Sequence, residues 1–217
     1  MASYIVHYQA GAKELTQRLF GRELTDWELG SAAGAPEGAT LAISSRRRRP
    51  ELFVEAQHPR IAKQERSFRC DADGNLYVYN LRFEKKERQD RGLGLECLMR
   101  QIGAAYKLGL QRIELHGAGS LFDSDDGYWR WPIYGFDAPL MASELRELAN
   151  HPQLSGAASL NELIERGGGN WLRVRGSGRS MCFILAPDSS MMRVLRAYLN
   201  ARPLIKKQLA ALIKELP

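Results

Sequence analysis

A six-residue loop with the sequence Gln-Asp-Arg-Gly-Leu-Gly, residues 89–94, is the stretch whose residue types point most directly to chemistry. It lies between a run that predicts a strand and a run that predicts a long amphipathic helix. Glycines let the backbone approach a ligand closely, and the first N–H groups of the following helix have no intrahelical partner. These N–H groups and the positive end of the helix dipole favour an anion. The loop therefore predicts a phosphate-binding cradle.

The elements that must position this loop are strongly patterned. Residues 75–83 alternate in polarity and predict a strand, and strict alternation places four side chains on one face: Tyr77, Tyr79, Leu81 and Phe83. After the loop, apolar residues at helical spacing from Leu95 to Leu108 predict a helix that Gly109 ends. Residues 112–116 predict the next strand. This order forms a βαβ unit, whose second strand can run parallel to the first.

The N-terminal part of the chain supplies the rest of a sheet. Residues 12–30 carry apolar side chains at helical spacing and predict one or two short helices, which the Gly-, Ala- and Pro-rich segment that follows ends. Consecutive antiparallel strands are predicted at residues 39–45, 51–58 and 64–70, and an Asp-Gly turn leads from the last of them into residues 75–83. The predicted fold class is α/β (α+β), with a mixed, mostly antiparallel central sheet and flanking helices.

The C-terminal part predicts a helical and hairpin elaboration. Short helices are expected at residues 142–150 and 160–165. Residues 171–175 and 181–185 flank a Gly-Ser-Gly turn and predict a hairpin. Two more helices, at residues 187–200 and 203–215, are expected to close the chain, with a proline opening the second.

Length and composition favour one domain over residues 1–217, because 44% hydrophobic residues suffice for one sizeable core. The sequence contains neither a transmembrane-length apolar run nor a signal-peptide pattern, so we expect no membrane partner. Three cysteines without paired spacing favour a reducing cytoplasm over a disulfide framework or zinc site. The net charge of +6 favours acidic partners, and nucleic acid is one option. Part of that excess is one arginine run, residues 46–49, which is more typical of a solvated turn.

The order of elements resembles the GNAT acyltransferase superfamily over residues 39–136. That family has the pattern Gln/Arg-x-x-Gly-x-Gly/Ala between its fourth strand and third helix, and Gln89, Gly92 and Gly94 match it here. It also often has an aromatic-rich helix that ends in Gly-Phe, as residues 128–136 do. The resemblance implies a GNAT-like core at residues 39–136, an elaboration at residues 137–217, and acetyl-CoA or another acyl-CoA as a substrate.

The resemblance also assigns binding roles along the strand and loop. The pyrophosphate of coenzyme A would accept hydrogen bonds from backbone N–H groups of five consecutive residues, Arg91, Gly92, Leu93, Gly94 and Leu95. The side chain of Arg88 or Arg91 would add charge-assisted contacts. The pantetheine arm would pair like a strand with the backbone of Leu81, Arg82 and Phe83.

Catalysis in this family needs a base for the acceptor amine and an acid for the leaving thiolate. Glu84 and His116, each at the end of a predicted strand, are the candidate bases. The family's frequent acidic tyrosine corresponds to Trp131 here, and an indole N–H is no ordinary proton donor to a thiolate. Tyr128 and Tyr134 are the nearby alternatives. Packing of these aromatic residues beneath an insertion is an equally good account.

These residues lead to two hypotheses about function. The first is an N-acyltransferase, acting by direct transfer of an acetyl or other acyl group to an amine on a small molecule or a protein. The second is a GNAT-like module without activity that binds nucleic acid or protein. Other enzyme classes are poorly supported, because the sequence lacks a P-loop, a Gly-x-Ser-x-Gly elbow and a clustered metal-ligand set.

Overall fold

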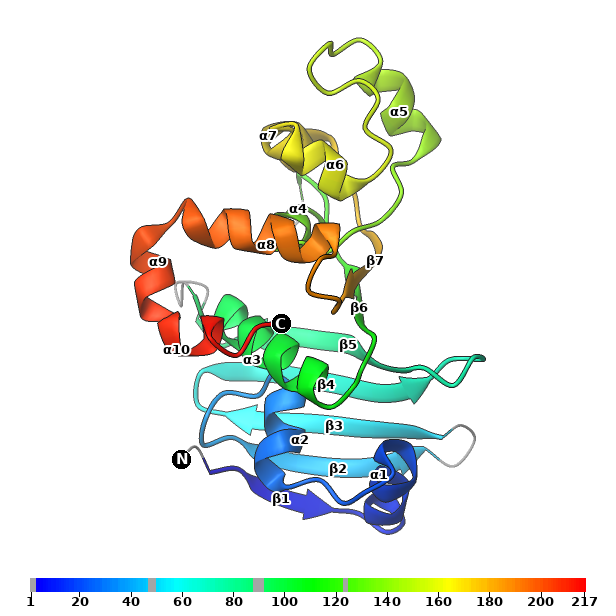
Figure 1. Ribbon diagram of the computed structural model, residues 1–217, viewed down its shortest axis with the longest axis vertical. Helices are drawn as coiled ribbons and strands as arrows, with labels where there is room; N and C mark the ends of the chain where they lie inside the picture. Colours follow the sequence, from blue (N-terminus) through cyan, green and yellow to red (C-terminus); the bar gives the residue numbers. More distant parts are fainter. Residues whose placement is uncertain (1–2, 47–49, 88–91, 123–124) are drawn as a thin grey trace. The chain divides into compact units, whose positions relative to one another are not determined.

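The computed structural model describes residues 3–217 apart from 47–49, 88–91 and 123–124 (Figure 1). The chain forms two compact units, each described here by itself. Unit 1 contains Met1–Ile113 and Ile205–Pro217, and unit 2 contains Glu114–Leu204. Among the described residues, the sheet holds seven strands that are neighbours in chain order, from β1 to β7. The fold is α/β with a mixed sheet, as the sequence predicts.

Unit 1 holds five strands of the sheet. The strands are β1 (Ile5–Tyr8), β2 (Thr40–Arg46), β3 (Glu51–His58), β4 (Ile61–Cys70) and β5 (Leu76–Lys85). Strands β2 to β5 pair antiparallel, which confirms the predicted series. Strand β1 was not predicted, and it pairs parallel to β2. Because of β1, the strand before the glycine loop is the fifth in the chain.

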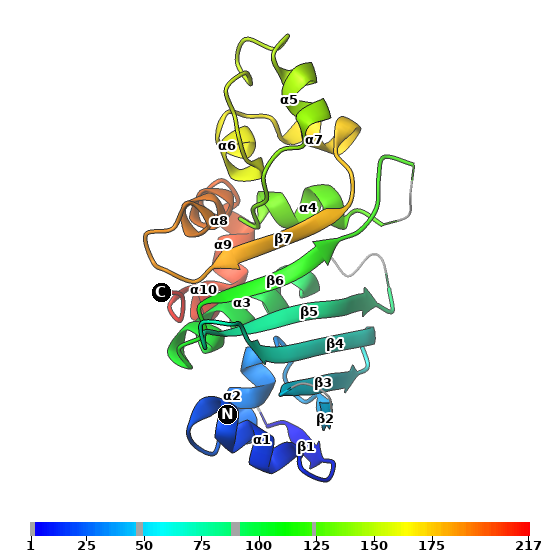
Figure 2. The same ribbon diagram turned by 90° about the vertical axis from the view of Figure 1, so that its right-hand side faces the viewer.

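Helices cover one face of these strands. They are α1 (Ala12–Phe20), α2 (Asp26–Ala32), α3 (Leu93–Lys107) and, near the C-terminus, α10 (Ala210–Ile213). Figures 1 and 2 show α1 and α2 on one side of β2 and β3. The strands place fully buried side chains on this face, among them Ile43, Leu52, Val54, Phe68 and Val78. The core of unit 1 therefore lies between one sheet face and the helices, and we call the other face the open face.

The last residues of the chain return to unit 1. The helix predicted at residues 203–215 is two helices, α9 (Pro203–Gln208) and α10, with Leu209 between them. Lys107 of α3 pairs with Glu215, and a Cβ atom at Gly103 would lie 2.8 Å from the Glu215 carbonyl oxygen. The glycine in α3 thus allows the chain terminus to pack closely against that helix.

Unit 2 is mainly helical. Its elements are α4 (Gly127–Ile133), α5 (Ala142–Leu148), α6 (Leu160–Glu165), α7 (Gly169–Arg175), β7 (Arg179–Ile184) and α8 (Ser190–Asn200), and β6 (Arg112–Gly117) crosses the unit boundary. The predicted hairpin at residues 171–185 is wrong, because its first arm is helix α7. Short runs such as Trp-Leu-Arg-Val-Arg fit both the two-residue period of a strand and the 3.6-residue period of a helix. Here Leu172 is buried, and its carbonyl accepts from the Gly176 N–H at 2.7 Å, as in a helix end.

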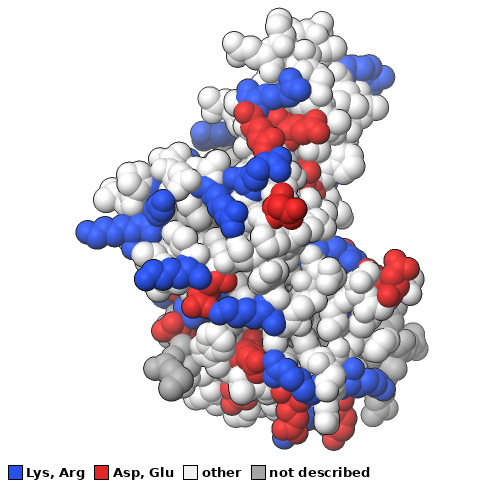
Figure 3. Space-filling view, in the orientation of Figure 1, with Lys and Arg blue, Asp and Glu red and all other residues white. Residues whose placement is uncertain are grey.

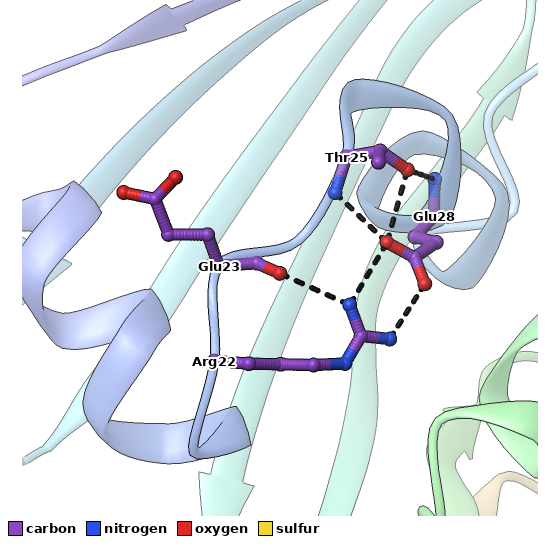
Figure 4. A network of polar contacts seen from close by, with 4 residues as sticks. All are labelled: Arg22, Glu23, Thr25 and Glu28. Atoms are coloured by element: carbon purple, nitrogen blue, oxygen red, sulfur yellow. Dashed lines mark hydrogen bonds and ion pairs between the residues drawn. The ribbon is translucent and has the colours of Figure 1, made fainter.

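Helix α2 begins at a capping box that an arginine extends (Figure 4). The Thr25 Oγ1 accepts from the Glu28 N–H at 3.2 Å, and the Glu28 carboxylate accepts from the Thr25 N–H at 2.8 Å. Arg22 pairs with the same carboxylate at 2.6 Å. The hydrogen bond from Arg22 is the main reason that the pKa of Glu28 falls from 4.5 to about 2. Across the described parts of the chain, no helix has the length and apolarity to span a membrane.

The capping box predicts a pH-dependent contribution to stability. Because the folded-state pKa of Glu28 is depressed, its carboxylate stabilises the fold fully above the unfolded-state pKa, and the effect is lost as pH falls toward about 2. Glu28→Gln keeps an oxygen for the cap but removes the charge. We expect its free energy of unfolding to fall below that of wild type at neutral pH, and the difference to vanish in acid. Urea titrations followed by circular dichroism at several pH values measure this, with the exposed Glu23→Gln as control. A difference that does not change with pH would contradict the assignment.

Candidate functional site

The backbone of β5 is interrupted just before the glycine loop. Glu65 of β4 lies opposite Arg82, yet the next residue, Arg66, lies opposite Asn80, so Leu81 has no partner residue on β4. This is a β-bulge, and it reverses the alternation of side chains along the strand. Tyr77 and Tyr79 lie on the open face. Phe83 instead pairs with Gln64 on the helix-covered face.

The prediction that Tyr77, Tyr79, Leu81 and Phe83 share one face is therefore wrong for Phe83. The single extra residue in β5 moves its ring to the core. There it packs against three buried residues, Ile61, Leu93 and Cys97. The ring also supports the start of α3, because a Cβ atom at Gly94 would lie 3.5 Å from Phe83 Cε1.

Helix α3 starts without a side-chain cap. Its N-cap is Gly92, with φ 113° and ψ −27°, a conformation that side chains with a Cβ atom rarely adopt. The Gly92 carbonyl accepts from the Glu96 N–H at 2.8 Å. Leu93 and Leu95 are buried, and Gly94 between them is half-buried. The N-cap glycine has no side chain that could accept from the first N–H groups, so this helix start suits an anion.

The turn between β3 and β4 brings basic groups to the same end of α3. Arg60 lies 3.6 Å from Glu96 in the first turns of the helix, and the Arg60 carbonyl accepts from the Lys86 N–H at 3.1 Å. The pKa of His58 is lowered, first by partial burial and then by the Arg60 cation. The sequence reasoning missed Arg60 and His58, although the sequence His-Pro-Arg between two predicted strands marks such a turn.

We call this assembly the β5–α3 site: residues 81–86 of β5 and its end, the start of α3 at Gly92–Leu95, and Arg60. It unites most of the predicted cofactor residues within unit 1, namely Leu81, Arg82, Phe83, Gly92, Leu93, Gly94 and Leu95. The predicted contacts of Arg88, Gln89 and Arg91 lie outside the described residues.

Glu84 lies on the open face at the end of β5. The bulge decides this orientation, since unbroken alternation would place Glu84 with Val78 and Asn80 on the helix-covered face. Its carboxylate accepts from Arg82 Nε at 2.5 Å, and about half of each side chain is exposed. Glu84 is therefore accessible to solvent, and its carboxylate is paired with the Arg82 guanidinium.

The other catalytic candidates belong to unit 2, and among them His116 is an exposed side chain of β6. Tyr128 is 2% exposed, and its hydroxyl donates to the Arg173 carbonyl at 2.6 Å. This hydroxyl is occupied in holding α4 to α7. Its role in the fold was not evident from the sequence, because Arg173 lies 45 residues away.

Tyr134 and Trp131 form an aromatic cluster at the end of α4. The Tyr134 ring packs edge-to-face against Trp131 at 6.2 Å and Tyr198 at 5.0 Å, and Trp131 packs against Phe136 at 5.5 Å. Burial, followed by the neighbouring Tyr198, raises the pKa of Tyr134 to about 12. Tyr134 thus remains protonated at neutral pH, as a proton donor must be.

No group of His, Cys, Asp and Glu among the described residues is arranged to hold a metal ion. No protein-family model matches this chain, and no curated protein sequence matches it either.

The placement of Tyr128 predicts a structural effect of its removal. Tyr128→Phe deletes the buried donor to the Arg173 carbonyl, and we expect it to lower the free energy of unfolding by about 1 kcal/mol. Urea unfolding followed by tryptophan fluorescence suits the measurement, because Trp129, Trp131 and Trp171 all lie in unit 2. Tyr79→Phe, on the open face of unit 1, is the control. A Tyr128→Phe protein as stable as wild type would refute the structural role.

Proposed function

We propose that the protein is an acyl-CoA-dependent N-acyltransferase with a GNAT-like core, and that the β5–α3 site binds the acyl-CoA. The observation that carries this proposal is the bulged end of β5, which leads into an uncapped helix start. A strand whose register is interrupted by a bulge, followed in the chain by a helix N-terminus, would match the two parts of one ligand, the amide-containing pantetheine arm and the pyrophosphate. The GNAT resemblance supplies the identity of that ligand.

In this proposal the first turn of α3 binds the pyrophosphate through the N–H groups of Leu93, Gly94 and Leu95. Arg60, which lies 3.6 Å from Glu96 in the first turns of the helix, would contact the pyrophosphate from the side. The pantetheine arm follows the backbone of residues 81–83. Phe83 supports this end of the site from below, because its ring packs under the start of α3.

The proposed chemistry is direct transfer. The acceptor amine attacks the thioester carbonyl, a C–N bond forms, and the C–S bond breaks. Backbone groups at the Leu81 bulge stabilise the oxygen that becomes negative. Within unit 1, Glu84 takes the proton from the amine and returns it to the leaving thiolate. His116, Tyr128 and Tyr134 belong to unit 2 and are given no step, and the Tyr128 hydroxyl already donates to the Arg173 carbonyl.

A binding module without turnover is the second candidate. The observation that favours it is the packing of Trp131, which occupies the usual tyrosine position and lies within the aromatic cluster. Nucleic acid is a poor fit to the open face of unit 1, where basic groups are paired with carboxylates: Arg69 with Glu51, Lys63 with Glu65 and Arg82 with Glu84. Figure 3 shows the other, helix-covered side of unit 1, where acidic and basic side chains also lie interspersed.

The proposal predicts that acetyl-CoA and CoA both stabilise the protein. A ligand at 100 times its Kd adds about 2.7 kcal/mol to the free energy of unfolding, which a thermal-shift assay detects. Gly94→Asp tests the position of the site, because an acidic residue in the first turn favours the helix but repels a pyrophosphate. We expect this variant to bind CoA at least about tenfold more weakly, a loss of about 1.4 kcal/mol.

Gly94→Asn is the matched control, because it has nearly the same size without the charge. It should keep most of the affinity and show the same fold by circular dichroism. Wild-type protein that shows no shift at millimolar acetyl-CoA would reject the proposed ligand. Equal losses in both Gly94 variants would show that bulk, and not charge, is responsible, and would count against a pyrophosphate at α3. Transfer of labelled acetyl groups to a panel of amines and peptides then separates the enzyme from the binding module.

A further inference from the structure

Arg66 is a buried cation without a carboxylate partner among the described residues. It lies on β4 and is 3% exposed. Burial lowers the pKa of its guanidinium to about 10, so the group stays charged at neutral pH. Its Nε has no hydrogen-bond partner in the described part of the chain. A buried charge without a carboxylate partner is costly, and its presence in a core needs a physical reason.

The contacts of Arg66 are concentrated on the β5 bulge. Its Nη1 donates to the Arg82 carbonyl at 2.7 Å and to the Glu65 carbonyl at 2.9 Å. These two residues face each other on β5 and β4 immediately beside the unpaired Leu81. One side-chain nitrogen therefore joins the two strands where the ladder is interrupted.

Asn80, opposite Arg66 on β5, is uncharged, and no carboxylate among the described residues pairs with the guanidinium. Its central carbon lies 5.7 Å from the centre of the Phe83 ring, and the Cys97 thiol nearby has a pKa raised by burial, so it is neutral. With no nearby carboxylate in the described residues, the positive potential of Arg66 is not cancelled locally. In a low-dielectric core, such a charge acts over a longer distance than in water.

We propose that Arg66 is a positioning residue for acyl transfer: it fixes the bulged backbone at Leu81–Arg82 and directs positive potential toward the thioester oxygen bound there. This inference rests on the proposed binding of acyl-CoA. A preorganised charge behind the hydrogen-bond donors would stabilise the oxygen as it becomes negative, without rearrangement during the reaction. The residue acts through the backbone and does not itself contact the substrate.

The test is the infrared carbonyl band of acetyl-CoA labelled with ¹³C at the thioester, measured free and bound to the protein. Polarisation of the carbonyl moves this band to lower wavenumber. Wild type should show that shift. Arg66→Met, which is of similar length but neutral, should lose most of it, and its affinity should fall more for acetyl-CoA than for unacylated CoA. Arg66→Lys, which keeps the charge, should restore part of the shift. Circular dichroism and urea unfolding verify the fold of each variant.

Arg66→Gln is a second neutral variant. Its amide keeps one hydrogen-bond donor, so it serves if Arg66→Met, which loses all polar contacts, does not fold. A full carbonyl shift in either folded neutral variant would overturn the inference. Equal losses of affinity for CoA and acetyl-CoA would also overturn it, and so would a failure of both neutral variants to fold. Either result would mean that Arg66 has a structural role alone. Wild type that binds neither ligand would instead reject the underlying proposal of an acyl-CoA site. The two failures are therefore distinguishable.

Discussion

The bulge at Leu81 is the constraint on which the rest of the β5–α3 site depends. Side chains in a strand alternate between faces, so one extra residue exchanges the faces of everything that follows. In β5 this exchange takes Phe83 into the core beneath the start of α3 and turns Glu84 toward solvent. Without the bulge, the aromatic support of the helix start and the accessible carboxylate would lie on opposite faces from those observed.

Buried polar groups hold the sheet around this bulge to the helices. The Gln64 amide donates to the Ala33 carbonyl at 2.9 Å and to the Gly34 carbonyl at 3.0 Å, at the end of α2. Asn80 and Gln101 of α3 exchange two hydrogen bonds of 2.9 Å. Together with Arg66, these groups form a polar row in an otherwise apolar core. The hydrogen bonds of this row favour one register, because any slip would break them; within the described residues, only Gln64 Oε1 and Arg66 Nε of the row have no partner.

The features that suit ligand binding lie in unit 1, whereas most candidate catalytic side chains lie in unit 2. The β5–α3 site combines a helix start at a glycine N-cap, the Arg60–Glu96 pair and a bulged strand within unit 1. In unit 2, the hydroxyl of Tyr128 is engaged in packing, and Tyr134 is held in an aromatic cluster that keeps it protonated. Binding of an acyl-CoA therefore has more physical support than transfer of its acyl group, and the proposed experiments measure the two separately.

The sequence by itself determined the local elements: the four strands from β2 to β5, helices α1 to α3, and the glycine break before α3. Local periodicity and turn residues are sufficient for these. The tertiary structure decided what depends on distant partners. Residues 169–175 form a helix because Leu172 packs inside unit 2. Phe83 and Glu84 lie on the faces opposite to those that unbroken alternation predicts, because β5 pairs with β4 through a bulge. Arg66 could not be distinguished from a surface residue, because β4 has polar side chains on both faces and only the register shows which are buried.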